Sequence, residues 1–240
     1  MKKAVRAISN ELRRSLLSMR FLITLAICLG VLYQPVFYLR EVGQGFRGMD
    51  MLNAIMSTLG IGYYVSAASL LCALACSDSY AWERMSGLYP YYLSRTGRKL
   101  YIAAKVISVS VTGGLTVSGG FAVFCAVQAL LLAPGASGAD MMVALRETGL
   151  FFTYGAAWAL AGLGVSAFIH SPIAAVVMPF CITQGLWLLY AIYNVPMLNP
   201  KNGIAIITGT QLSMPMIACQ QLIVALISIV VFAMAVERSR

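Results

Sequence analysis

The residues best suited to chemistry in this chain lie in one stretch, 78–105. It reads DSYAWERMSGLYPYYLSRTGRKLYIAAK, with an acidic helix end up to Gly87, a tyrosine-rich middle and a basic cluster. Carboxylate and guanidinium groups on a rigid helical hairpin can form charge-assisted hydrogen bonds with a soluble protein and transmit its movement. The stretch is therefore suited to contacts with a soluble protein. The candidate residues are Glu83, Arg84, Gly87, Arg95, Arg98 and Lys99.

The rest of the sequence offers no arrangement typical of an active site. The only histidine, His170, stands alone, and the six cysteines form neither a C-x-x-C pair nor a cluster with histidine. The sequence contains no H-E-x-x-H motif and no phosphate-binding loop of the G-x-x-x-x-G-K-[ST] type. We therefore expect no catalytic residues, no metal site and no cofactor on this chain.

Long uncharged segments on both sides of this stretch indicate a membrane protein. With 60% hydrophobic and 10% charged residues, the chain has too little polar surface for a soluble enzyme. About 20 apolar residues are needed to cross a bilayer as a helix. A window of that length predicts an all-α, polytopic fold with six transmembrane helices in a single transmembrane domain, 1–240. The predicted spans are 21–38, 55–76, 106–132, 150–169, 173–193 and 220–236.

The basic residues predict the orientation of these spans. An excess of Lys and Arg marks cytoplasmic segments, and placing both termini in the cytoplasm puts thirteen of the 17 basic residues on that side. The net charge of +9 does not indicate nucleic acid, because these residues flank spans, where they orient the chain and meet anionic lipid headgroups. The four that remain outside are Arg40, Arg47, Arg146 and Lys201.

The predicted spans carry no ionisable residue in their middle. Such residues are costly in a bilayer and usually serve ion coupling, voltage sensing or catalysis. Their absence argues against a proton-driven carrier, and a transporter of this kind must receive its energy from another chain.

Two segments outside the spans have a predicted membrane role. Residues 1–20 show apolar positions at three- and four-residue steps between basic ones, which indicates an amphipathic helix on the cytoplasmic leaflet. Alternatively, they are a basic flank that only sets topology. Residues 204–216, rich in Gly, Thr and Pro, are predicted to form a re-entrant segment on the outer side. The alternative is a long, tilted last span after a loose loop.

Local signals predict how neighbouring spans meet. In the turn His170-Ser171-Pro172, Ser171 is expected to cap the following helix and Pro172 to occupy its first turn. Small residues gather in the third and fourth spans, including Gly113, Gly114 and Gly155, and predict close helix contact.

The stretch 78–105 resembles the loop after the second span of type 2 permeases of the ATP-binding cassette transporters. In that family an acidic residue and a glycine precede the pattern L-[SR]-R-x-x-R, an aromatic residue and a lysine. The matching positions here are Glu83, Gly87, Leu93, Arg95, Arg98, Tyr101 and Lys105. The chain also resembles the family in outline, in its basic start, its six spans with both ends inside and the segment before the last span.

The resemblance implies a coupling helix within 78–105 that docks on a separate ATPase subunit, which holds the ATP and magnesium. It also implies a second permease copy or a homologous permease, and a path lined mainly by the second and fifth spans. Expected partners are thus ATP-binding cassette ATPase subunits, the second permease and the lipid bilayer. The path candidates are Tyr63, Tyr64, Ser66, Gln184, Trp187 and Tyr190.

The sequence thus predicts a permease subunit in a bacterial plasma membrane that exports a drug-like, lipidic or peptide substrate. Two alternatives remain open at this point. Arg95, Arg98 and Lys99 also fit charges that only fix topology beside the third span. The whole chain also fits a non-transporting membrane sensor or immunity protein.

Overall fold

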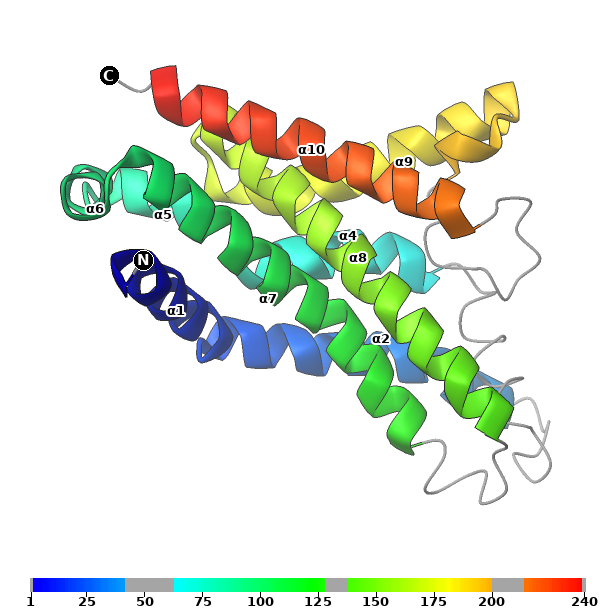
Figure 1. The fold of residues 1–240 in the computed structure, drawn as a ribbon. Helices are drawn as coiled ribbons and strands as arrows, with labels where there is room; N and C mark the ends of the chain where they lie inside the picture. Colours follow the sequence, from blue (N-terminus) through cyan, green and yellow to red (C-terminus); the bar gives the residue numbers. More distant parts are fainter. Residues whose placement is uncertain (1, 42–62, 128–137, 200–213, 239–240) are drawn as a thin grey trace.

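The fold is a bundle of α-helices, seen in a computed structural model that describes residues 2–41, 63–127, 138–199 and 214–238 (Figure 1). The helices are α1 (Lys2–Leu16), α2 (Met19–Glu41), α4 (Tyr63–Cys76), α5 (Ser79–Met85), α6 (Tyr89–Thr96), α7 (Arg98–Val127), α8 (Gly138–Ile169), α9 (Pro172–Tyr193) and α10 (Met214–Arg238), with a 3₁₀ turn, η2 (Pro196–Leu198). The expectation of an all-α chain is confirmed for the described residues.

Four of these helices are long and apolar enough to cross a membrane: Arg98–Val127, Ala144–Ile169, Pro172–Tyr193 and Pro215–Arg238. A fifth is counted if the bent pair α1 and α2 forms one span. The protein is therefore a multi-pass membrane protein. The second predicted span, 55–76, is described only from Tyr63, so the number six is not reached within the described residues.

The first two helices are separated by a sharp bend. The axes of Lys3–Leu16 and Met19–Gln34 differ by 53°. Ser18 makes the break, because its hydroxyl donates to the Ser15 carbonyl at 2.7 Å and accepts from the Phe21 amide at 3.2 Å, which caps the start of α2. The predicted helix within 1–20 is present, and α1 packs against α7.

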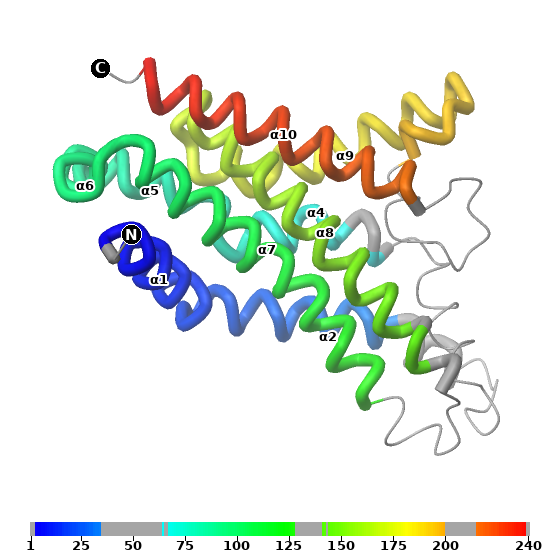
Figure 2. The backbone as a smooth tube through the Cα atoms, viewed as in Figure 1, coloured from blue at the N-terminus to red at the C-terminus, as the bar shows by residue number. Residues whose placement is uncertain are grey.

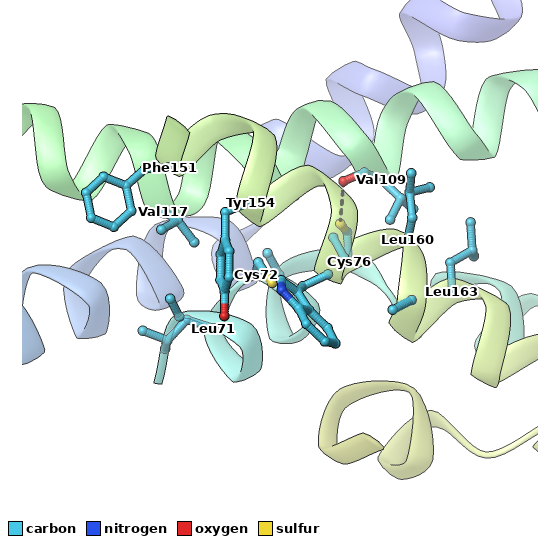
Figure 3. Packing of buried hydrophobic residues seen from close by; sticks show 14 of the residues in the cluster. Leu71, Cys72, Cys76, Val109, Val117, Phe151, Tyr154, Leu160 and Leu163 are labelled. Atoms are coloured by element: carbon cyan, nitrogen blue, oxygen red, sulfur yellow. Dashed lines mark hydrogen bonds between the residues drawn. The ribbon is translucent and has the colours of Figure 1, made fainter. Parts of the chain in front are cut away.

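The core lies where α7 and α8 pack against each other. A Cβ on Gly155 would lie 2.5 Å from the Gly113 carbonyl oxygen, so only glycine permits this approach. The predicted close contact of the third and fourth spans is confirmed. Figure 3 shows the surrounding side chains of α4, α7 and α8, including Tyr154 and the Cys76 thiol that donates to the Val109 carbonyl at 3.6 Å.

Burial differs sharply between the spans. In α7 and α8, 56% and 67% of the apolar window is buried, against 17% in α9 and 22% in α10. Helices α9 and α10 therefore present broad apolar faces outward from the bundle. The turn before α9 forms as expected, since Ser171 Oγ accepts from the Ala174 amide at 3.4 Å and Pro172 is the first helical residue.

Several predicted boundaries were wrong, because the helices extend beyond the predicted spans. Helix α8 begins at Gly138, twelve residues before the predicted start at 150. Helix α7 begins at Arg98 and includes the end of the 78–105 stretch. Helix α10 begins at Met214, six residues before the predicted start at 220, and the rest of the segment 204–216 lies outside the described residues.

The longer helices bring ionisable side chains into the candidate spans. Lys105 on α7 is 1% exposed, and Glu147 on α8 is fully buried. Glu147 accepts from neighbouring Arg146 at 3.3 Å, while its Oε2 has no hydrogen-bond partner among the described residues. Both residues lie towards the ends of their candidate spans. The expectation that no ionisable residue lies in the middle of a span therefore still holds for these two helices.

Candidate functional site

Helices α1, α5 and α6, the start of α7 and the end of α10 gather at one end of the bundle, together with the chain termini (Figures 1 and 2). We call this region the basic end. It contains the whole stretch predicted to dock a partner, and its exposed cations include Arg84, Arg95 and Lys99.

A buried charge cluster holds the basic end together. Glu83 on α5 is 2% exposed, and its Oε1 accepts from Lys105 Nζ at 2.8 Å and from Arg14 Nη1 at 2.9 Å. The other carboxylate oxygen, Oε2, accepts from the Tyr101 hydroxyl at 2.7 Å. Lys105 also donates to Glu11 on α1. We refer to these five residues as the Glu83 cluster.

The electrostatics of the Glu83 cluster are balanced. Two carboxylates, Glu11 and Glu83, face two cations, Arg14 and Lys105, so the charges within the cluster cancel; Glu83 and Lys105 are buried, and Arg14 is half exposed. A buried ion pair whose groups are all hydrogen-bonded is tolerated, whereas removal of one partner leaves a costly uncompensated charge. The cluster therefore fixes α1, α5 and α7 to one another.

Glycine and proline residues set the turns of the hairpin α5–α6. Gly87 ends α5 with φ of +71°, a left-handed conformation that favours glycine, and Pro90 lies in the first turn of α6. Gly97, with φ of +78°, separates α6 from α7. Gly87 therefore forms part of the turn between α5 and α6.

Aromatic contacts and a second ion pair anchor the same hairpin. The fully buried Tyr80 ring packs edge-on against Tyr89 and Phe232, with centroids 5.5 and 5.3 Å apart. Arg20 on α2 donates to Asp78 Oδ2 at 2.7 Å, and the Trp82 indole donates to the same oxygen at 2.8 Å. The hairpin is therefore tied to α2 and α10 in addition to α1 and α7.

A groove of about 810 Å³ opens between α1, α6 and α7. It carries cations on both walls, and the Arg95 guanidinium lies 4.8 Å from the centre of the Tyr91 ring. Its charged and aromatic lining consists of Lys3, Arg6, Glu11, Arg14, Tyr91, Tyr92, Arg95, Tyr101 and Lys105. Such a surface suits an acidic segment of a protein, because guanidinium groups pair with carboxylates in bidentate geometry.

The structure separates the predicted docking residues into three places. Glu83 lies inside, where its carboxylate bonds to the protein's own cations and does not reach the surface. Arg95 lines the groove. Arg84, Arg98 and Lys99 lie on the side towards α10, where Arg84 donates to His170 Nε2 at 2.5 Å and the other two line a second groove with Arg238.

The predicted path residues differ in burial and do not share one surface. Tyr64 is 1% exposed and donates to the Val117 carbonyl at 3.2 Å, so α2, α7 and α8 enclose it and a path between two protomers would not include it. On α9, Trp187 is 45% exposed, and Gln184 and Tyr190 are half-buried. Tyr63 and Ser66 lie on α4, but their side chains are outside the described residues.

The sequence reasoning missed Glu11 and Arg14 as partners of Glu83. One signal was available, because Glu11 is the only acidic residue among the first 40, in a segment otherwise rich in Lys and Arg. A single carboxylate in a basic helix indicates a specific cation partner. No group of three or more His, Cys, Asp or Glu that could hold a metal occurs within the ranges that the structure describes.

Comparison of the sequence with protein-family models finds no matching family, and searches of curated proteins and of solved structures find no match either.

Proposed function

We propose that this chain is the membrane-spanning permease subunit of an ATP-driven exporter. A separate ATPase subunit, with ATP and magnesium, would dock at the basic end, which would face the cytoplasm of a bacterial cell. This chain would carry no catalytic residues and would convert closure of the ATPase into alternating access for a drug-like, lipidic or peptide molecule.

The observation that supports the proposal most is the attachment of the hairpin α5–α6 to the bundle. The Glu83 cluster links the hairpin to α1 and α7, and the Arg20–Asp78 pair links it to α2. A force applied to α6 would therefore move three other helices as a unit. A rigid, charged surface element of this kind suits mechanical coupling to a partner better than passive orientation of the chain.

The groove between α1, α6 and α7 is the proposed docking surface. In this arrangement Arg95 would contact the ATPase directly, while Glu83 would act through the positions of α5 and α1. Loss of one charge-assisted hydrogen bond at such a surface costs about 1.5–3 kcal/mol, roughly a ten- to hundredfold change in affinity.

The broad outward face of α9 supports a second permease copy. Only 17% of its apolar window is buried in the protomer, and it carries the half-buried Gln184 and Tyr190 next to Trp187. Polar and aromatic groups between two copies would line a path for amphiphilic cargo.

An experiment on the energy source of efflux tests this proposal. Efflux from cells or inverted vesicles should persist when the proton gradient is collapsed at constant ATP, and should stop when the partner ATPase is disabled. Glu147→Gln, which removes the buried carboxylate of α8, should leave efflux unchanged. Loss of efflux on collapse of the gradient, or in Glu147→Gln, would instead favour a proton-coupled carrier.

A further inference from the structure

A small basic pocket lies where α5, α8 and α10 end. It has a volume of about 190 Å³. Three basic side chains from three parts of the chain line it: Arg84 from α5, His170 from the turn after α8, and Arg238 from the end of α10. We call it the Arg84 pocket.

The side chains of the Arg84 pocket are held in place by local structure. Arg84 Nη1 donates to His170 Nε2 at 2.5 Å and lies 3.4 Å from the Tyr80 hydroxyl, whose ring is fully buried. His170 has φ of +54°, a conformation that few residues with side chains adopt, and its amide donates to the Ser166 carbonyl at 3.0 Å. The fold therefore brings Arg84 and His170 together and keeps them there.

The positive charge in this pocket has no matching carboxylate among the lining residues. The last turns of α8 and all of α9 carry no charged residue. Glu237, which precedes Arg238 in the chain, lines the neighbouring groove, which Arg238 shares with two further cations, Arg98 and Lys99. Partial burial and the adjacent guanidinium of Arg84 lower the pKa of His170, so the pocket already disfavours more positive charge.

Apolar side chains border these cations directly. Phe168 lines the pocket and is 57% exposed, and its neighbour Ile169 is 53% exposed. Both lie at the end of the candidate span Ala144–Ile169, where a helix leaves the hydrocarbon region. A ligand that matches this surface is anionic at one end and apolar at the other.

We propose that the Arg84 pocket binds the phosphate headgroup of an anionic phospholipid, whose acyl chains lie along Phe168 and Ile169. Arg84 and Arg238 would donate to the phosphate oxygens, in the geometry that guanidinium groups favour. Basic pockets between helices at the cytoplasmic membrane surface suit such headgroups. A bound lipid would thereby link the hairpin to α8 and α10.

Protonation of His170 should be coupled to lipid binding. A phosphate beside the ring favours the imidazolium form, which adds a third donor in place of an acceptor. By linkage, a ligand that raises the proton affinity of His170 must itself bind more tightly when His170 is protonated. Affinity should therefore rise as the pH falls from about 7.5 to about 5.5.

The test is lipid retention by the purified chain alone, so that its outcome does not depend on any ATPase. The protein would be placed in nanodiscs of phosphatidylcholine with increasing phosphatidylglycerol, and bound lipid counted by native mass spectrometry. We expect Arg84→Ala and Arg238→Ala each to weaken phosphatidylglycerol binding about fivefold, since each basic residue near the surface contributes about 1 kcal/mol. Arg146→Ala, which removes a half-exposed cation at the start of the Ala144–Ile169 span, is the matched control and should bind as wild type.

Two further arms identify the ligand. His170→Gln should abolish the gain in affinity at acid pH while it retains binding at neutral pH. Soluble glycerol phosphate should compete poorly, because it lacks the acyl chains. Equal retention in Arg84→Ala, Arg238→Ala and Arg146→Ala would overturn the proposal. So would full competition by glycerol phosphate.

Discussion

The Glu83 cluster predicts that Lys105→Met destabilises the protein strongly, although it removes only one side chain. Lys105 is 1% exposed and neutralises Glu83 and Glu11. Without it, two carboxylates face the single cation Arg14, and one negative charge is left uncompensated. Breaking a buried ion pair in this way costs about 3–5 kcal/mol.

The matched control lies on the same helix. Lys99 on α7 is exposed and forms no ion pair with any other residue in the described ranges, so Lys99→Met should change the free energy of unfolding by no more than about 0.5 kcal/mol. Both variants would be compared by unfolding in detergent, followed by tryptophan fluorescence.

A double-mutant cycle then isolates the interaction. The variant Glu83→Gln/Lys105→Met removes one charge of each sign, and leaves Glu11 to balance Arg14. It should therefore be more stable than the sum of the single changes predicts, by about 1–3 kcal/mol. Additive effects, or a Lys105→Met variant as stable as Lys99→Met, would refute the reasoning that this network holds the basic end together.

The remaining predictions concern packing, burial and orientation. Gly155→Ala should lower the free energy of unfolding by about 1–3 kcal/mol, because the added Cβ would overlap the Gly113 carbonyl oxygen. Its control, Gly185→Ala, should be tolerated, since no atom lies within 4 Å of the added Cβ. Equal unfolding midpoints for the two variants would contradict this prediction. Glu147→Gln should leave stability unchanged or raise it, since one carboxylate oxygen already lacks a donor; a large loss of stability would indicate a partner for the charge. A cysteine at Arg95, in a background without native cysteines, should resist an impermeant thiol reagent in intact cells, and labelling from outside would invert the proposed orientation.

Local features were the ones that the sequence predicted well. The turn at Ser171 and Pro172 forms as expected because a cap and a helix-starting proline act through neighbouring residues alone. The close packing of Gly113 against Gly155 also followed from residue type, because small residues permit helices to approach in a membrane.

Helix ends were predicted poorly, for a physical reason. Hydropathy detects the hydrocarbon region, but a helix continues beyond it as long as its backbone hydrogen bonds are satisfied. Helix α8 therefore includes Arg146 and Glu147, which the uncharged run at 150–169 excluded.

The Glu83 cluster could not be derived from periodicity. Lys105 and Glu11 are 94 positions apart, and only the fold of α1 against α7 brings them into contact. The sequence therefore singled out Glu83, yet assigned its carboxylate to a surface contact, whereas the carboxylate is buried and makes internal contacts.

The most direct test of the proposed function is recovery of ATP hydrolysis with the chain after extraction in mild detergent. The proposal predicts that wild-type protein and Arg146→Ala bring down a subunit that hydrolyses ATP, and that Arg95→Ala, which alters the groove, loses most of that activity while remaining in the membrane at normal levels. Recovery of the intact chain without any ATP-hydrolysing subunit, or equal recovery with Arg95→Ala, would contradict the proposal.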